Sequence, residues 1–158
     1  MFLQKFSNTG VRLWATYYGG SLSDEGWSIA IDNADNVFIF GYTESTNFPT
    51  LNAGTFFQGT YGGQGDAIIL KFNSAGTRLW ATYYGGANME EGFGITTDPA
   101  GNIFMTGETR STTTFPLLNP GGGAFYQGTF GTGTSDAFVL KFDNAGNRIW
   151  STFAGGWN

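Results

Sequence analysis

A nine-residue sequence, Arg-Leu-Trp-Ala-Thr-Tyr-Tyr-Gly-Gly, constrains the fold of this chain more than any other feature. It spans residues 12–20, recurs unchanged at 78–86, and returns at 148–156 as Arg-Ile-Trp-Ser-Thr-Phe-Ala-Gly-Gly. Three related copies within 158 residues identify a repeat array. In such an array each repeat is a small structural unit that packs against its neighbours. This nonapeptide therefore marks the repeat.

Each repeat contains four short runs of aromatic and β-branched residues bounded by Gly, Asn and Asp, a pattern that indicates β-strands. The periods are 66 and then 70 residues, measured between the equivalent lysines Lys5, Lys71 and Lys141. We expect first strands near 27–32 and 93–98, second strands near 37–42 and 103–108, third strands near 2–6, 68–72 and 138–142, and fourth strands near 12–18, 78–84 and 148–153. No segment shows a helical hydrophobic period, so the sequence predicts an all-β protein.

The predicted strands are apolar on both faces. Ile68–Leu70 and Val37–Phe40 are apolar at every position, so protein must cover both sides of these strands. In a β-propeller each antiparallel four-stranded blade packs between two others and leaves only short, protected edges. We therefore predict about two and a half propeller blades: a half-blade of third and fourth strands at 1–20, and full blades at 21–86 and 87–158.

The composition disfavours several classes of function. The net charge is −5 with no basic stripe, which argues against nucleic-acid binding. No apolar run is long enough to span a membrane as a helix. The absence of His removes the commonest general base, and the absence of Cys removes thiolate metal sites. Charged residues make up only 12%, while 26 glycines and 18% aromatics suit short strands joined by tight turns.

Several motifs recur two or three times along the chain. They include the segment Asp136–Trp150, the Tyr-Tyr-Gly-Gly ends of the nonapeptides, Asp-Pro-Ala-Gly-Asn at 98–102, and Ser-Thr-Asn-Phe-Pro-Thr at 45–50. Together they resemble the bacterial SBBP-type β-propeller repeat, and the resemblance covers essentially the whole chain. It implies a β-propeller found mostly in secreted or cell-surface bacterial proteins, with no established enzymatic activity.

The resemblance implies a non-enzymatic module that acts as a protein-interaction scaffold or as an adhesion or assembly unit. A carbohydrate-binding propeller module is the alternative, and a hydrolase or quinoprotein fragment is disfavoured by the absence of His. The expected partner is another protein, a second copy joined through open blade edges, or a glycan. No cofactor is expected. The expected location is extracellular or at the cell surface, and residues 1–6 match a repeat strand rather than a signal peptide.

Two long connections, about 44–65 and 109–135, join the second and third strands and exceed the ~12–15 residues expected of an unstructured loop. In an antiparallel meander they lie at the same end as the loops that join successive repeats, which carry acidic pairs. We therefore predict a ligand-binding face formed by Phe57, Tyr61, Tyr126, Phe130, Asp24, Glu25, Glu90 and Glu91. The alternative is that these aromatic residues are buried as a cap on the propeller.

The acidic pairs Asp24–Glu25 and Glu90–Glu91 have two interpretations. Paired carboxylates supply the oxygen ligands that Ca²⁺ prefers, so a calcium site at these loops is one of them. However, no Asp-x-Asp-x-Asp-Gly ladder accompanies the pairs, so solvated loop charges are favoured and no metal site is predicted.

Other repeat-equivalent residues are assigned structural roles. The tryptophan of each nonapeptide resembles the docking tryptophan of quinoprotein propellers, but the turn before it is one residue shorter, and packing between blades is favoured. The arginine that opens each nonapeptide is expected to point outward at the surface. The lysine and aspartate of the third strand are expected to form an ion pair or a turn hydrogen bond. These structural residues are Trp14, Trp80, Trp150, Lys71, Lys141, Asp66 and Asp136.

The order of predicted strands bears on assembly. The chain holds three pairs of third and fourth strands but only two pairs of first and second strands. A closed propeller needs roughly four or more blades, and open apolar edges favour pairing with another chain. We therefore expect a fragment of a longer array, or a chain that associates with itself or with a partner protein.

Overall fold

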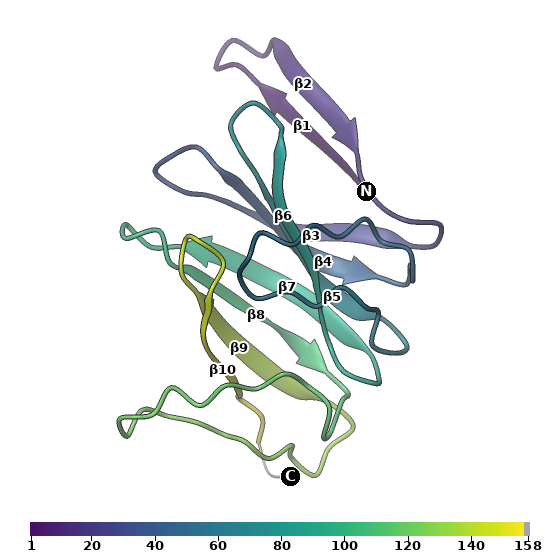
Figure 1. The fold of residues 1–158 in the computed structure, drawn as a ribbon, viewed down its shortest axis with the longest axis vertical. Helices are drawn as coiled ribbons and strands as arrows, with labels where there is room; N and C mark the ends of the chain where they lie inside the picture. The colour runs from purple at the N-terminus through teal and green to yellow at the C-terminus, as the bar shows by residue number, and fades with distance from the viewer. Residues whose placement is uncertain (157–158) are drawn as a thin grey trace.

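The structure, a computed structural model that describes residues 1–156, consists of three consecutive antiparallel sheets (Figure 1). Its strands are β1 (Phe2–Phe6), β2 (Arg12–Tyr17), β3 (Asp24–Ile31), β4 (Val37–Thr43), β5 (Asp66–Phe72), β6 (Arg78–Tyr84), β7 (Glu90–Thr97), β8 (Ile103–Thr109), β9 (Asp136–Phe142) and β10 (Arg148–Phe153). Among the described residues no helix has the length and apolarity that a membrane crossing requires. The predicted all-β, antiparallel fold class is confirmed.

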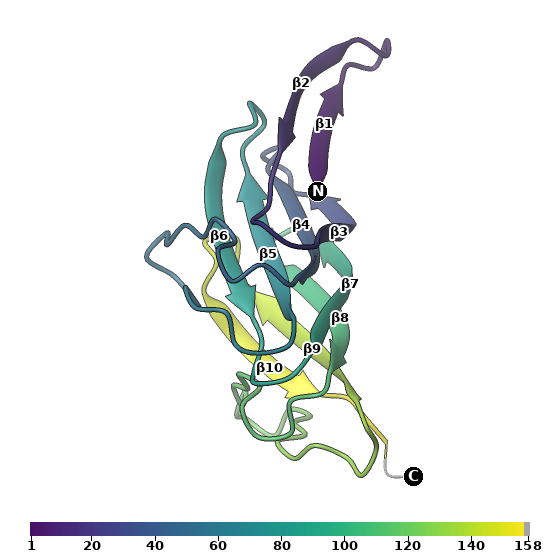
Figure 2. The same ribbon diagram turned by 90° about the vertical axis from the view of Figure 1, so that its right-hand side faces the viewer.

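The strand order matches propeller blades. β1 and β2 form a two-stranded half-blade, followed by four-stranded sheets in the orders β3-β4-β5-β6 and β7-β8-β9-β10. Figures 1 and 2 show the three sheets one after another along the long axis, with the N-terminus at the half-blade. The strands of each sheet fall within one of the predicted segments 1–20, 21–86 and 87–158. The segment boundaries stay a prediction, and residues 157–158 lie outside the described residues.

One Asp or Asn organises each short turn of the two full blades, and Ser7 does so in the half-blade. Asp32 Oδ1 accepts hydrogen bonds from the backbone N–H groups of Ala34 and Asn36, both at 2.9 Å. Asn73 makes the equivalent bonds in the turn between β5 and β6. The fourth residue of that turn, Gly76, has φ +83°, a conformation that costs little only for glycine. These turns therefore follow directly from the local sequence.

The apolar core lies in two layers between the sheets. One layer joins the half-blade to β3–β6 and includes Leu3, Ile39 and Leu70. The other layer joins β3–β6 to β7–β10 and is dominated by large aromatic residues. It contains Phe38, Phe40, Trp80, Tyr84, Phe138, Phe142 and Phe153. β4 and β5 of the middle blade are therefore buried on both faces, as apolar strands require, whereas β3 stays largely exposed.

The nonapeptide tryptophans lie between neighbouring blades. Trp80 is buried, and its ring lies against Gly146 in the turn between β9 and β10 of the next blade. The ring of Trp14 lies against the equivalent glycine, Gly76, and its Nε1 donates to Ser74 O at 3.1 Å. Each of these blades thus places an aromatic ring on the third-to-fourth-strand turn of the next.

The expected ion pair of Lys71 with Asp66 does not form, whereas the other expectation, a turn hydrogen bond, is met with a turn of the next blade. Lys71 Nζ donates to the backbone and side-chain oxygens of Asn144, at 2.7 and 2.8 Å, and Lys5 Nζ donates to Ser74 O at 3.0 Å. Lys71 and Asp66 stand at opposite ends of β5, too far apart for an ion pair. Lys141, at the same position of the last blade, lies over the Phe104 ring at 5.1 Å. Lys5 and Lys71 therefore bridge neighbouring blades.

Because Trp80 is buried between blades, Trp80→Ala is expected to lower the free energy of unfolding by about 3–5 kcal/mol. Trp150→Ala removes the same atoms from a half-buried site, so a loss of only about 1–2 kcal/mol is expected. Urea unfolding of both variants at low protein concentration compares them. Equal losses would show that contact with the next blade is not what stabilises the tryptophan.

Candidate functional site

The two long connections cover the outer edges of the blades. Leu51 pairs with Ala81 of β6 through backbone hydrogen bonds of 2.8 and 3.1 Å, and Leu118 pairs in the same way with Ser151 of β10. Each connection thus forms hydrogen bonds with the fourth strand, whose edge would otherwise be open to other chains. Most of the length of these loops therefore has a structural role.

The Phe-Pro turn of each connection is held by the nonapeptide. Arg78 Nη1 donates to Pro49 O at 2.8 Å, and Arg148 Nη1 donates to Pro116 O at 2.8 Å. Arg148 also lies over the Phe56 ring at 4.9 Å. The expectation that these arginines point outward at the surface is therefore wrong for these two, because the long connection folds back over the end of the fourth strand.

The predicted aromatic ligand residues divide into two groups. Tyr61 packs edge-on against Tyr83, with ring centroids 5.9 Å apart, and Phe130 is buried with its ring 5.7 Å from Phe153. These two residues belong to a cap, which was the alternative interpretation. Phe57 is 36% exposed, and Tyr126 is half-buried with its ring folded over Gly128.

The two acidic residues of each pair lie on opposite sides of the strand that carries them. Asp24 Oδ2 accepts from Gly20 N at 2.7 Å, and Glu90 Oε2 accepts from Gly86 N at the same distance. Thr109 Oγ1 donates to the other oxygen of Glu90 at 2.6 Å, and Glu90 is fully buried. A solvated loop charge is therefore the wrong description of Glu90.

Glu25 and Glu91 point to the opposite side of the first strand, because successive side chains of a strand alternate between its faces. Glu25 is exposed and accepts a hydrogen bond from Trp27 Nε1 at 2.7 Å. The two members of each pair therefore do not converge on one ion. Within residues 1–156 no three acidic side chains come close enough to hold a metal.

Asp66 and Glu90 form a buried acidic cluster where the two full blades meet. Asp66 Oδ2 accepts from Gly62 N at 2.9 Å and from Gln58 Nε2 at 3.0 Å. A Cβ atom on Gly85 would lie 2.4 Å from Glu90 Oε2 and 2.8 Å from Asp66 Cγ. The first glycine of the Gly-Gly pair is therefore required to make room for both carboxyl groups.

Burial raises the pKa of Asp66 to about 7, an effect that the Gly62 N–H opposes and the charge of Glu90 reinforces. Burial also raises the pKa of Glu90, although hydrogen bonds from Ser111, Thr109 and Gly86 oppose that shift. Both carboxyl groups therefore keep their protons to a higher pH than exposed carboxyl groups do.

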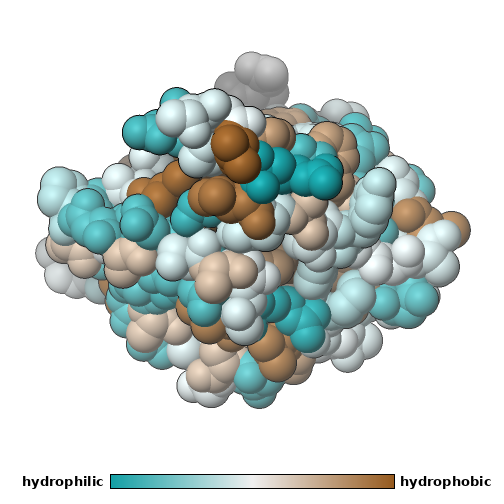
Figure 3. Space-filling model, turned by 90° about the horizontal axis from the view of Figure 1, so that it is seen from above, coloured by the Kyte–Doolittle hydropathy of each residue, from teal (hydrophilic) through white to brown (hydrophobic). Residues whose placement is uncertain are grey.

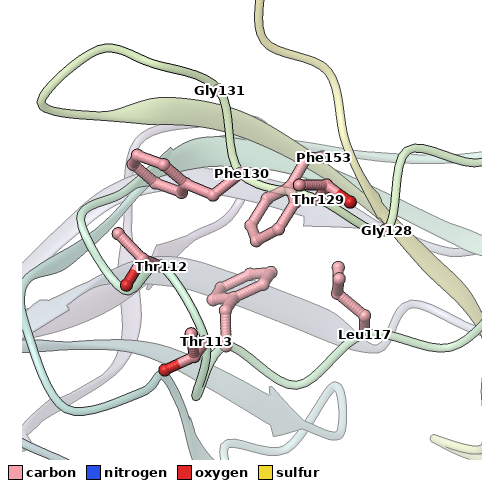
Figure 4. Close-up of a pocket in the computed structure, with 9 residues that line it drawn as sticks. Thr112, Thr113, Leu117, Gly128, Thr129, Phe130, Gly131 and Phe153 are labelled. Carbon is pink, nitrogen blue, oxygen red and sulfur yellow. The ribbon is translucent and has the colours of Figure 1, made fainter.

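A hollow of about 470 Å³ opens between the two arms of the last connection (Figure 4). Its walls are the segments 112–117 and 128–131, and its floor is Phe153 of β10. In the preceding blade a tyrosine stands at the position of Phe153: Tyr83 Oη donates to Ser45 O at 2.7 Å and accepts from Phe48 N at 3.0 Å. Phe153 has no hydroxyl group, so it cannot form these two hydrogen bonds with the loop above it in the last blade.

The sequence analysis did not identify the hollow. Its signal was present in the aligned repeats, where Tyr83 becomes Phe153 and Tyr61 becomes Phe130. The last connection is also longer, with one threonine added before its Phe-Pro turn, so that Thr112 and Thr113 stand at the entrance. The sequence signal for the hollow is therefore the loss of two hydroxyl groups together with one added residue.

A second unpredicted feature is an exposed aromatic row on the first strands. Trp27 stacks on Phe93 with ring centroids 5.5 Å apart, and on Tyr42 at 6.0 Å. Trp27 and Phe93 lie where the pairing register of β3 and β7 shifts, which leaves one extra residue on each strand. Such bulges depend on the neighbouring strand and were not readable from the repeat pattern.

The fold and these loops define a repeat scaffold built from propeller blades. Residues 13–49 and 79–113 match the SBBP family model, which is described as a beta-propeller repeat. The chain therefore carries SBBP-type β-propeller repeats, and the resemblance found in the sequence is confirmed.

The chain is also similar to a viral protein, the "Uncharacterized WD repeat-containing protein L264" of Acanthamoeba polyphaga mimivirus. The two are 27% identical over 172 aligned residues, which cover 96% of this chain. The chain spans about 12% of the viral protein's length. The similarity thus concerns a repeat region within a much longer protein.

The raised pKa of Asp66 makes a prediction about pH. The folded protein binds this proton more tightly than the unfolded chain does, so the contribution of Asp66 to stability is greatest at low pH. It falls as pH rises from about 4 to about 7, by up to ~1.4 kcal/mol per pH unit, and then stays constant. Asp66→Asn resembles the protonated acid and should lose this dependence.

Urea unfolding of the wild type and Asp66→Asn at several pH values between 4 and 8 tests this. The variant is expected to match the wild type near pH 4 and to be the more stable protein at pH 8. A stability difference that stays constant across the range would contradict the assignment, because all other titrating groups are shared by the two proteins.

Proposed function

We propose that this chain is a non-enzymatic interaction module of a secreted or cell-surface bacterial protein, and that it binds its partner at the loop end of its last blade. The observation that carries the proposal is the hollow above Phe153, at a position that a tyrosine hydroxyl fills in the preceding blade. The secreted location and bacterial source rest on the resemblance to the SBBP-type repeat.

A binding role fits the chemistry of the loop end better than catalysis does. Asp24 and Glu90 accept hydrogen bonds from backbone N–H groups, and Arg78 and Arg148 donate to backbone carbonyls. These hydrogen bonds hold the loops in place. The similarity to a WD-repeat protein supports the same reading at the level of a repeat scaffold.

The lining of the hollow indicates the chemistry of the partner. Phe115, Phe130 and Phe153 provide an apolar interior, and Thr112 and Thr113 supply hydroxyl groups near the entrance (Figure 4). An apolar side chain from a partner protein fits such a site, while its backbone reaches the threonines. Apolar anchors of this kind dominate the energetics of many protein interfaces.

A glycan is the second candidate, because the hollow combines aromatic surface with hydroxyl groups in a small space. Screening the wild-type chain against a displayed peptide library and a glycan array separates the two. Enrichment of peptides with an apolar anchor supports a protein partner, and binding to glycans alone supports the carbohydrate module.

Phe153→Tyr is expected to narrow the hollow by bonding one of its walls to its floor. The new hydroxyl can donate to Ser111 O and accept from Phe115 N, as Tyr83 does with Ser45 and Phe48. Binding of the peptides or glycans selected by the wild type should be lost, while the free energy of unfolding rises by about 1 kcal/mol.

The matched control is Tyr83→Phe in the preceding blade. It removes the same hydroxyl from a buried hydrogen-bonded site and should destabilise the fold by about 1–3 kcal/mol without abolishing binding. If Phe153→Tyr binds as well as the wild type, the hollow is not the binding site.

A further inference from the structure

The contact between the two full blades shows which residues join neighbouring blades. On β3–β6 it is made by Phe38, Phe56, Ile69, Lys71 and Trp80. The equivalent residues of the last blade are Phe104, Phe125, Val139, Lys141 and Trp150. In residues 1–156 no further blade covers this second set, which forms the open face of the last blade.

The open face of the last blade is apolar and exposed, as expected of a surface that contacts another blade. Phe125 is 72% exposed, whereas its equivalent Phe56 is packed against Tyr84 and Phe142. An apolar hollow of about 320 Å³ lies between Phe125 and Trp150. One wall of it is Ala154, which stands where the preceding blade has the large side chain of Tyr84.

The half-blade carries the complementary surface. Phe138 and Phe142 fill the contact between the full blades, and their equivalents on β1 are Phe2 and Phe6. Phe2 is 67% exposed and Phe6 is 52% exposed. Viewed from this end of the molecule, the surface in Figure 3 shows apolar residues gathered among polar ones. These two phenylalanines and the turn 7–10 form the open face of the half-blade.

The turn between β1 and β2 has the geometry that receives a lysine and a tryptophan elsewhere in the chain. Gly10 has φ +80°, close to the +83° of Gly76, and both glycines close the same backbone hydrogen bond, of 3.0 Å. Gly76 lies against the Trp14 ring, whereas a Cβ on Gly10 would meet nothing within 4 Å. Lys5 donates to Ser74 O, and the equivalent acceptor in the free turn is Asn8 O.

We propose that two copies of this chain associate head to tail, with the half-blade of one copy on the last blade of the other. In this contact Lys141 Nζ donates to Asn8 O of the second copy, and the Trp150 ring lies against Gly10. Phe2 and Phe6 enter the apolar hollow beside Phe125. The contact continues the one that already joins the two full blades.

One substitution favours the half-blade over a complete blade as the occupant. Phe40 is buried against Gly92 on the first strand of the next blade, where a Cβ would lie 2.7 Å from its ring. The equivalent residue of the last blade is the exposed Thr106, whose hydroxyl donates to Phe138 O at 2.9 Å. The ring that seats a first strand is therefore missing, while the groups that seat third and fourth strands are kept. The half-blade consists of third and fourth strands.

The proposal is tested by sedimentation velocity over a wide range of protein concentration. The wild type should show concentration-dependent association. Phe125→Asp on one open face and Phe6→Asp on the other should each weaken it by at least about thirtyfold, the effect expected for a central apolar residue of an interface. Both residues are exposed in the single chain, so neither change should prevent folding.

Mixing the two variants distinguishes head-to-tail contact from any symmetric one. Each variant keeps one intact open face, so the mixture should form a one-to-one complex and stop there. Ile149→Asp is the matched control and should associate like the wild type, because the equivalent Leu79 stays 39% exposed with the next blade in place.

Three results would overturn the proposal: a wild type that stays monomeric, association that survives both variants, or a mixture that does not form the complex. Phe153→Tyr changes neither open face and should still associate. Failure of self-association is thus distinguishable from failure of the proposed partner site.

Discussion

The structure depends on one repeated contact, in which a blade places its tryptophan and lysine on the third-to-fourth-strand turn of the next. Between the full blades, Trp80 lies against Gly146 while Lys71 Nζ binds Asn144. Asn144 Nδ2 also donates to Asp32 at 2.7 Å, so one turn connects two strands of the preceding blade. A blade that is apolar on both faces is not stable alone, and this contact sets the position of its neighbour. Stability therefore accumulates from contacts between neighbours rather than from a single central core.

The long connections solve a second problem created by the same architecture, which is the exposed edge of each fourth strand. They cover that edge and are held at the loop end by buried carboxylates and by the Gly-Gly pair that makes room for them. Because the two full blades share this design, their differences stand out. Phe153, in place of Tyr83, forms the floor of a hollow at the loop end. Thr106 in place of Phe40 changes the face that a next blade would meet. Such departures from the repeat are where specific binding can arise without loss of the fold.

The sequence predicted the strands well because repetition averages out local ambiguity. Every predicted strand exists, and the largest shifts are at β3 and β7, which begin three residues earlier than expected, at Asp24 and Glu90. Because of that shift, Asp24 and Glu90, which were predicted to lie in loops, are the first residues of strands. Acidic residues before a strand suggest a solvated loop. Here the preceding Gly-Gly pair donates N–H groups to them, and the threonine at the end of the second strand donates a hydroxyl group. The partners of Lys71 and Arg78 likewise lie in other elements, the next blade and the long connection. No local pattern could reveal those contacts.

Assembly and partner binding are linked by the geometry of the repeat. Successive blades place their long connections at the same end, so copies that continue the blade-to-blade contact present their hollows on one side. A head-to-tail contact does not close on itself between two copies and can therefore extend to further ones. Several modest sites on one side of such an assembly act together on a multivalent partner, and the effective concentration of the second site strengthens binding without any new contact. A single small hollow with an apolar floor is too limited for high affinity. Association through the open faces would place several such hollows on one side, where they bind together.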